Sequence, residues 1–323
     1  MRVMLIVNPF ATATTPAGRD ALVHTLSSHF SLDVEHTTHR GHAGELAERA
    51  VADGVDAVIV HGGDGSVNEV VNGLLGAPDP TVDVFGDDRR LPTLGVIPGG
   101  SANVFARTLG IAADPLAATS QIIELLDSGQ QRRIGLGHTQ HRWFLFNTGM
   151  GMDAVVVHAM ETKRHAGKAA TPGRYLWTTI SSFFSHAGSQ DTFTVEVPDH
   201  EPVPGVRFGF VSNTSPWTYL GKYEIRTNPK TGFDTRLGLF AATSTGVWAN
   251  LPLAARLLTH RPPKARHLYR DDDVAWVRFR AAEPIDVQMD GDYVGAHTLL
   301  EFGYRTSALS VVAPNQITRA SSR

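Results

Sequence analysis

Two glycine-rich segments hold the residues best suited to chemistry. One reads HGGDGS over residues 61–66, and the other reads PGGSAN over residues 98–103. Glycine lets the backbone turn sharply and approach a ligand without a side-chain clash. A helix that begins at such a loop directs its first N–H groups and the positive end of its dipole at the same space. Phosphate suits that environment, although neither segment matches the GxxxxGK[ST] phosphate loop.

The competing interpretation of each segment is a tight turn that leads into a helix. A single GGDG sequence leaves both interpretations open, whereas a second segment of the same build favours ligand binding. Asp64 stands among glycines, where we expect it to bind or orient a ligand. In the second segment Ser101 offers a hydroxyl and Asn103 offers an amide.

Two carboxylates near the end of the chain are suited to proton transfer. Asp290 and Asp292 flank a glycine in the sequence DGD. A carboxylate that lies beside a hydroxyl group can take its proton. Asp-Gly is also a favoured β-turn sequence, so a purely structural interpretation of this pair stays open.

Composition narrows the chemistry further. The 323 residues, about two domains' worth, are 42% hydrophobic and 19% charged, which is typical of a globular protein. The absence of cysteine excludes a disulfide framework, a thiolate nucleophile and a cysteine-ligated metal. A net charge of −3 does not indicate nucleic acid as a partner. The fifteen histidines are scattered without an HExxH motif, so we expect no histidine metal site.

The first 130 residues alternate the signals of strands and helices, which predicts an α/β domain with a mostly parallel sheet covered on both faces. Ligands bind beyond the carboxyl ends of the strands in such sheets, where both glycine segments lie. We expect Ser66 to open a helix with Glu69 completing a capping box, and Ser101 to cap the next helix. The predicted strands cover 3–7, 32–36, 57–60 and 94–97, and the predicted helices cover 17–29, 44–52, a stretch from Ser66, a stretch from Ser101 to Gly110, and a stretch from Asp114-Pro115 to Gly129.

After residue 135 short apolar runs separated by turns predict a larger β-sandwich-type domain. We therefore expect one domain over 1–135 and a second over 136–323, with a frayed tail that is able to return to the first domain. The predicted helices of the second domain cover 172–186 and 247–259. The apolar runs are 143–147, 193–197, 206–212, 237–242, 276–279, 285–289 and 309–312.

No segment reaches eighteen apolar residues without a charge, and the N-terminus lacks the pattern of a signal peptide. These features predict a cytoplasmic protein that is able to touch a membrane from outside. Two stretches, 163–184 and 256–270, mix basic with apolar residues, which suits docking on anionic lipid headgroups. A solvated loop and a helix with a buried aromatic face are the alternative interpretation.

Six motifs together resemble the diacylglycerol kinase catalytic-domain family, which includes bacterial soluble lipid kinases and sphingosine kinases. The family is similar to NAD kinases and phosphofructokinases. The resemblance extends over nearly the whole chain. The motifs are Asn8-Pro9, GGDGSVNEVVNGL at 62–74, PGGSANVFARTLG at 98–110, NTGMGMDA at 147–154, NPKTGFDTRL at 228–237 and QMDGDYVG at 288–295.

The resemblance implies roles for individual residues. Asp292 falls where the family has a glutamate that acts as general base, with Asp290 as the alternative, and Asp153 matches an acidic position near the acceptor pocket. Asp234, with the carbonyls of Thr231 and Arg236, resembles a structural magnesium site. The implied nucleotide-binding residues are Asn8, Pro9, Thr38, Gly62, Gly63, Asp64, Gly65, Ser66, Asn68, Glu69, Gly99, Gly100, Ser101 and Asn103.

Several positions depart from the family pattern. Phe10-Ala11 replaces Ser-Gly, Val104 replaces an acidic residue, Thr235 replaces a glycine, and Asp292 shortens the base by one methylene. Phe10-Ala11 and Val104 lie in the segments that the resemblance assigns to nucleotide binding, and Thr235 lies in the implied magnesium site.

The activity that the resemblance implies is an ATP- and Mg²⁺-dependent lipid kinase acting on diacylglycerol or a related long-chain alcohol. Two alternatives stay open. One is an NAD kinase-like enzyme, which shares GGDG, and the other is a non-catalytic protein that binds nucleotide or lipid. The implied partners are a lipid substrate and an anionic membrane surface, without nucleic acid, and the sequence is compatible with a homodimer.

Overall fold

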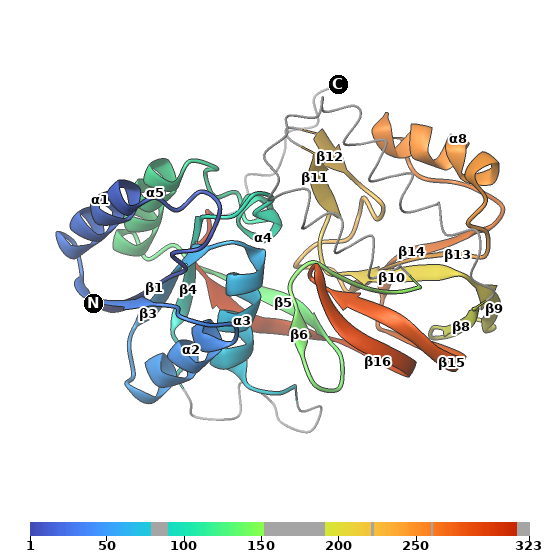
Figure 1. Ribbon diagram of the computed structural model, residues 1–323, viewed down its shortest axis with the longest axis horizontal. Helices are drawn as coiled ribbons and strands as arrows, with labels where there is room; N and C mark the ends of the chain where they lie inside the picture. The colour runs from blue at the N-terminus through green and yellow to red at the C-terminus, as the bar shows by residue number, and fades with distance from the viewer. Residues whose placement is uncertain (79–89, 152–190, 221–222, 260, 315–323) are drawn as a thin grey trace. The chain divides into compact units, whose positions relative to one another are not determined.

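The structure is a computed structural model that describes residues 1–78, 90–151, 191–220, 223–259 and 261–314 (Figure 1). The chain forms two compact units. Unit 1 consists of Met1–Gly135 together with the segment from Thr306 onward, and unit 2 consists of Leu136–Arg305.

Unit 1 is built on a parallel sheet, as predicted. The strand order is β4-β3-β1-β2. At the outer side of β4, Val311 at the end of β16 (Asp292–Val311) pairs in parallel with Leu94 of β4. Every residue of β3 is buried, and in β1 only Arg2 is exposed, because helices cover both faces of the sheet. The four strands are β1 (Arg2–Val7), β2 (Ser31–His36), β3 (Ala57–Gly62) and β4 (Thr93–Pro98).

The helices of unit 1 pack in pairs. Helix α1 contacts α5 and helix α2 contacts α3, and Figure 1 shows the two pairs on opposite faces of the sheet. The prediction for α5 is confirmed, since the Asp114 carboxylate accepts from the N–H of Ala117, Pro115 follows it, and Gly129 is left-handed after the helix. The helices are α1 (Pro16–Ser27), α2 (His42–Ala52), α3 (Asp64–Leu75), α4 (Val104–Thr108) and α5 (Pro115–Asp127).

The predicted capping box of α3 is wrong. The helix begins at Asp64 with Gly63 as its N-cap, so Ser66 already lies inside the first turn. The Glu69 carboxylate instead accepts from the N–H groups of Gly41 (2.9 Å) and Ala43 (3.3 Å) at the start of α2. Gly41 has no side chain to cap α2, so the acceptor must come from a neighbouring helix.

Unit 2 is an antiparallel, β-rich unit. Its main strand order is β14-β13-β10-β7-β15-β16, with β8 paired to β15 and β9. A separate two-stranded sheet holds β11 (Thr218–Leu220) and β12 (Tyr223–Ile225). The remaining strands are β5 (Arg132–His138), β6 (Trp143–Phe144), β7 (Asn147–Met150), β8 (Phe193–Glu196), β9 (Val203–Val206), β10 (Phe208–Ser212), β13 (Leu237–Ala242), β14 (Leu268–Val274) and β15 (Trp276–Met289).

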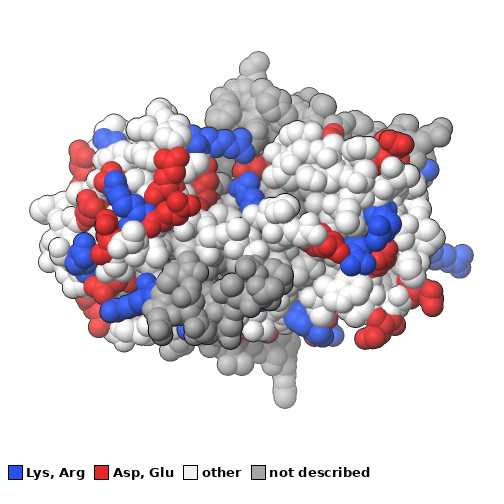
Figure 2. All heavy atoms as spheres, turned by 90° about the horizontal axis from the view of Figure 1, so that it is seen from below, with Lys and Arg blue, Asp and Glu red and all other residues white. Residues whose placement is uncertain are grey.

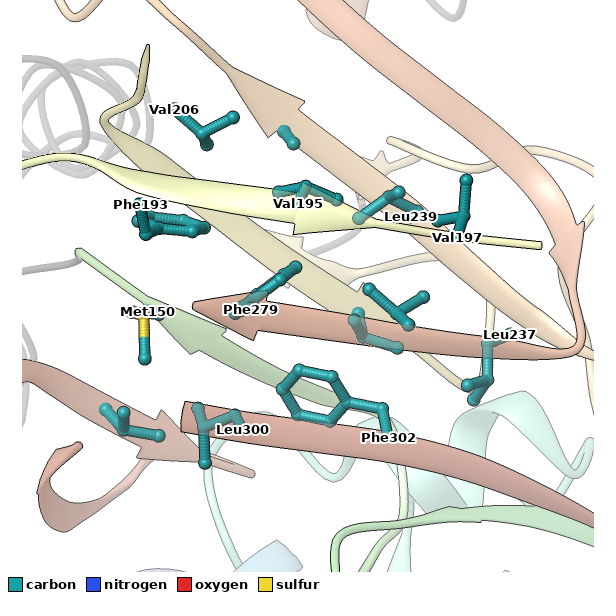
Figure 3. Packing of buried hydrophobic residues seen from close by; sticks show 14 of the residues in the cluster. Met150, Phe193, Val195, Val197, Val206, Leu237, Leu239, Phe279, Leu300 and Phe302 are labelled. Atoms are coloured by element: carbon teal, nitrogen blue, oxygen red, sulfur yellow. The ribbon is translucent and has the colours of Figure 1, made fainter. Parts of the chain in front are cut away.

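Alternating residues of the central strands fill two cores in unit 2. Leu237 and Leu239 of β13 join a cluster that includes Phe279 and Phe302 (Figure 3). Phe240, the residue after Leu239, points to the opposite face and packs with residues of α8 (Val247–Leu258). Both faces of β13 are therefore buried, which explains its continuous apolar run.

Most of the runs predicted as strands of the second domain are found, with four differences. The run 206–212 is divided between the end of β9 and β10, and the run 309–312 falls at the end of β16, within unit 1. The run 143–147 is divided into β6 and β7, and the runs 276–279 and 285–289 are the two ends of the single strand β15. The predicted helix over 247–259 is confirmed as α8, whereas the one over 172–186 lies outside the described residues. None of the helices in the described part of the chain is long and apolar enough to span a bilayer.

Candidate active site

Three loops of unit 1 join into one edge at the carboxyl ends of its strands. The N–H of Asn8, after β1, donates to the carbonyl of His61 at 2.9 Å. The N–H of Gly99, after β4, donates to the carbonyl of Gly62 at 2.8 Å, and the N–H of Ala13 donates back to Gly99 at 2.8 Å. The loops that follow β1, β3 and β4 are thus hydrogen-bonded to one another through their backbones.

The paired glycines of the two segments are required by this loop–loop packing. A Cβ on Gly100 would lie 2.6 Å from the Cα of Gly63, and a Cβ on Gly99 would lie 3.0 Å from the Cα of Gly62. Gly65 differs, because a Cβ there meets nothing within 4 Å among the described residues. Four glycines therefore let the loops pack against each other, and Gly65 leaves open space at the start of α3.

Asp64 links the two glycine loops. Its carboxylate oxygens accept from the N–H groups of Val104 (3.0 Å) and Phe105 (3.1 Å), the first two residues of α4. This structural role was not expected from the sequence. Asn103 precedes the helix in a left-handed conformation (φ 48°), and its amide closes a turn by accepting from the N–H and donating to the carbonyl of Gly100.

The predicted capping of α4 by Ser101 is wrong, because α4 begins three residues later and Asp64 occupies its N-terminal N–H groups. Ser101 is exposed in the loop instead. Its hydroxyl therefore lies at the surface of the same edge.

Asn8 and His61 hold the first loop in place. The Asn8 amide donates to the Ser66 hydroxyl at 2.9 Å and accepts from the N–H of Phe10 at 2.9 Å. His61 is buried, with Nε2 3.1 Å from the Thr14 hydroxyl and Nδ1 3.3 Å from the Ile97 carbonyl. Burial lowers the pKa of His61, which favours the neutral ring. Sequence reasoning missed His61, whose only signal is its position at the end of a buried strand.

Three other predicted nucleotide-binding residues lie near this edge or behind it. Thr38 follows β2, which pairs with β1, and its hydroxyl lies 3.1 Å from Nδ1 of His42. Asn68 is buried inside α3, where its oxygen accepts from the Asn72 amide, and Glu69 caps α2. The structure therefore gives Asn68 and Glu69 roles in the packing of α3, one turn beyond the loop.

The edge is suited to binding an anion. The twelve-residue helix α3 begins at Asp64, and its first turn presents backbone N–H groups and the positive end of the helix dipole. Gly65 is exposed in this turn. A phosphate group at this position would meet N–H donors without meeting a side chain at Gly65.

The DGD sequence in unit 2 forms a turn, as the Asp-Gly pair favours. Met289 pairs with Asp292, which leaves Asp290 (φ 50°) and Gly291 (φ 90°) as a two-residue hairpin loop of type I′ character. Asp292 is half-buried at the start of β16, and its carboxylate lies 3.6 Å from the guanidinium of Arg142.

The Asp290 carboxylate is engaged by the backbone. It accepts from the N–H groups of Leu145 (2.6 Å) and Phe146 (3.0 Å), which separate β6 from β7, and of Asn147 (3.1 Å), the first residue of β7. Burial raises the pKa of Asp290 to about 6, although these hydrogen bonds and the charge of Arg142 act to lower it. Three backbone donors thus occupy the Asp290 carboxylate, whereas the Asp292 carboxylate lies beside a guanidinium.

The loop that resembles a magnesium site is held by hydrogen bonds of its own. The Thr235 hydroxyl lies 3.2 Å from the Arg236 carbonyl, one of the implied ligands, and the Thr231 hydroxyl donates to Asp272. Asp234 is exposed, and the described residues contain no group of three histidine or acidic residues that could hold a metal. The implied ligands are one carboxylate and two backbone carbonyls, which is a ligand set of another kind, so the magnesium site at Asp234 stays a prediction. Asp153 lies outside the described residues.

Comparisons with known proteins agree on one family. The family model for the diacylglycerol kinase catalytic domain matches residues 2–138. A diacylglycerol kinase from Staphylococcus aureus (strain JH9) is 35% identical over 126 residues. This match covers 39% of the chain and spans only 35% of the length of that relative.

Two crystal structures from Bacillus anthracis share the fold over 97% of both chains. One, of a candidate diacylglycerol kinase, has a TM-score of 0.73 at 23% identity. The other, of a diacylglycerol kinase, has a TM-score of 0.69 at 20% identity. At these identities the likeness concerns the arrangement of the elements.

Proposed function

From the match of residues 2–138 to the family model for the diacylglycerol kinase catalytic domain, we propose that the chain belongs to this family and is an ATP-dependent lipid kinase. It would transfer the γ-phosphoryl group to the hydroxyl of diacylglycerol or a related long-chain alcohol. The observation that supports this best is the joined edge of glycine loops at the start of α3, held together by Asp64. Such an edge suits the phosphates of a nucleotide.

Phosphoryl transfer depends on alignment and charge neutralisation. In the proposed reaction the acceptor oxygen forms a bond to the γ-phosphorus, the bond from that phosphorus to the β–γ bridging oxygen breaks, and ADP leaves. The first turn of α3 and the Gly99-Gly100 loop would hold the phosphates, and ATP would enter with a divalent ion, which we propose to be Mg²⁺, on its phosphate oxygens. Asp292 would accept the proton of the acceptor hydroxyl.

A kinase assay with a panel of acceptors tests the proposal. Purified full-length protein is incubated with γ-labelled ATP, Mg²⁺ and, separately, diacylglycerol, sphingosine, NAD or no acceptor. We expect label in a lipid product, and loss of turnover in Asp292→Asn with nucleotide binding retained. Label in NADP would support an NAD kinase-like enzyme instead. Nucleotide binding without transfer to any acceptor would support a non-catalytic protein.

We further propose that the segment around α8 docks on anionic membrane. Residues 235–270 contain six basic residues and no acidic one, whereas both signs of charge intermingle on the face of the molecule in Figure 2. Helix α8 exposes Ala249, Leu251 and Pro252, and the exposed Arg261, Lys264 and Arg266 follow it. An apolar face beside basic side chains fits an anionic lipid surface. The other basic stretch, 163–184, lies outside the described residues.

Co-sedimentation with vesicles tests the docking. We expect the protein to bind vesicles of mixed phosphatidylcholine and phosphatidylglycerol, and to bind phosphatidylcholine alone much less. The triple variant with Arg261, Lys264 and Arg266 changed to glutamine should bind the mixed vesicles less, and Leu251→Ser should do the same. Equal binding to both vesicle types would contradict the proposal.

A further inference from the structure

We propose that Gln288 and Asp290 are positioning residues that fix the carboxylate of Asp292 for proton transfer. The proposal rests on the proposed function, in which Asp292 is the base. It is carried by one hydrogen-bonded network of buried side chains within unit 2, beside the turn that joins β15 to β16.

The backbone before Asp292 has an uncommon conformation. Asp290 and Gly291 both have positive φ, and only Gly291 adopts this region without steric cost. Asp tolerates this region better than most residues, so the Asp-Gly sequence selects the type of turn, whereas the surrounding contacts fix where the turn lies. The position of Asp292 therefore depends on what holds the turn.

Gln288 ties this turn to the neighbouring strand. Its amide nitrogen donates to Oδ1 of Asn147 at 2.9 Å, and its amide oxygen accepts from the N–H of Gly291 at 3.1 Å. Gln288 is 3% exposed and Asn147 is 5% exposed, so water does not readily replace either bond. One buried amide thus connects β7 to the residue that immediately precedes Asp292.

Asp290 holds the other side of the same turn. Beyond its carboxylate bonds to the N–H groups of 145–147, its own N–H donates to the carbonyl of Asn147 at 2.7 Å. Arg142, which lies 3.6 Å from the Asp292 carboxylate, precedes this clamped segment by three residues. The network therefore fixes the backbone that precedes Asp292 and the segment that follows Arg142.

Such a network acts on the rate of the chemical step. A general base must stay within hydrogen-bond reach of the proton it takes. A displacement of about 1 Å can reduce a rate on the order of 10²-fold. We therefore expect the loss of the Gln288 amide to lower kcat for lipid phosphorylation and to leave KM for ATP and lipid nearly unchanged.

Two substitutions of Gln288 test the inference in the full chain. Gln288→Met keeps the length of the side chain and removes both hydrogen bonds. Gln288→Glu keeps both only while the introduced carboxyl is protonated, since it can then donate to Asn147 and accept from Gly291. Thr148→Val is the matched control, because it removes a buried hydrogen bond to the Gln288 carbonyl (2.9 Å) and leaves the amide network intact.

We expect kcat to fall on the order of 10²-fold in Gln288→Met, with both KM values within about twofold of wild type. Gln288→Glu should recover part of the lost kcat at low pH, and this recovery should disappear as the introduced carboxyl ionises. Thr148→Val should stay within about threefold of wild-type kcat.

Near-normal kcat in Gln288→Met, with Asp292→Asn inactive, would overturn the inference and leave the proposed function standing. Full activity in Asp292→Asn would overturn the assignment of the base itself. Equal losses in Gln288→Met and Thr148→Val would reduce Gln288 to a stabilising role and also overturn the inference.

Discussion

Replacing Asp290 with asparagine should change the way in which the stability of unit 2 depends on pH. Burial raises the pKa of the Asp290 carboxyl from its ordinary value of 3.8 to about 6. At 1.36 kcal/mol per unit of pKa, the folded protein then disfavours the ionised carboxylate by roughly 3 kcal/mol. A raised carboxyl pKa contributes stability that is fully present below 3.8 and is lost as the pH rises through about 6.

The variant cannot ionise at this position and lacks this pH dependence. Between roughly pH 4.5 and pH 7.5 the wild-type protein should lose about 2 kcal/mol of unfolding free energy relative to Asp290→Asn. A second effect is independent of pH, because the new amide can no longer accept from every N–H of 145–147. An unsatisfied buried donor costs about 1–3 kcal/mol, so the variant should be the less stable protein at the acidic end.

Urea unfolding followed by tryptophan fluorescence measures this difference. All five tryptophans fall between residues 143 and 276, so the signal reports on unit 2. Asp292→Asn is the matched control, since it makes the same chemical change two residues away at a carboxylate that faces Arg142. A gap between wild type and Asp290→Asn that stays constant with pH would refute the reasoning. A wild type that gains relative stability as the pH rises would show that the three N–H donors outweigh desolvation.

Three further predictions concern unit 1 and the membrane. Asp64→Ala should increase amide exchange at Val104 and Phe105 by about tenfold or more in hydrogen-exchange mass spectrometry, since two charge-assisted hydrogen bonds worth about 1–2 kcal/mol or more are removed. Gly65→Ala should keep the thermal melt of the wild type and weaken ATP binding at least tenfold by calorimetry, whereas Gly100→Ala should lower the melting temperature as well; equal melts would contradict the loop-packing argument. Vesicle binding should weaken as NaCl is raised from about 0.05 M to 0.5 M, and binding that is insensitive to salt would exclude an electrostatic contribution.

Local signals in the sequence predicted the elements well. The strands β1, β3 and β4 of unit 1 are buried on both faces and appear as continuous apolar runs, as 57–60 does for β3. The start of α5 is encoded within four residues by Asp114, Pro115 and the N–H of Ala117. The Asp290-Gly291 turn is equally local, because its two residues and their register are sufficient to define it.

Side chains whose partners are distant in the sequence were not predictable in the same way. Asp64 accepts from α4 forty residues further on, Glu69 accepts from the N-cap of α2, which lies 28 residues before it, and Asp290 holds a segment about 145 residues earlier. Periodicity and capping rules describe neighbours along the chain, so they assigned Glu69 to its own helix. The glycine pattern marked the correct loops, but most of those glycines serve contacts between the loops rather than an approach to a ligand.

The hydrogen bonds that join the glycine loops also bear on the entropy of ligand binding. The backbone of this edge is fixed by hydrogen bonds within the protein itself. They are made by Asp64, by the Gly100–Asn103 turn and by the N–H of Gly99 to Gly62. The conformational entropy of ordering these loops is therefore lost during folding, and little of it remains to oppose the arrival of a phosphate. Such preorganisation makes the edge a rigid template, so differences in affinity among nucleotides should arise from the ligands and the side chains around the edge rather than from rearrangement of the loops.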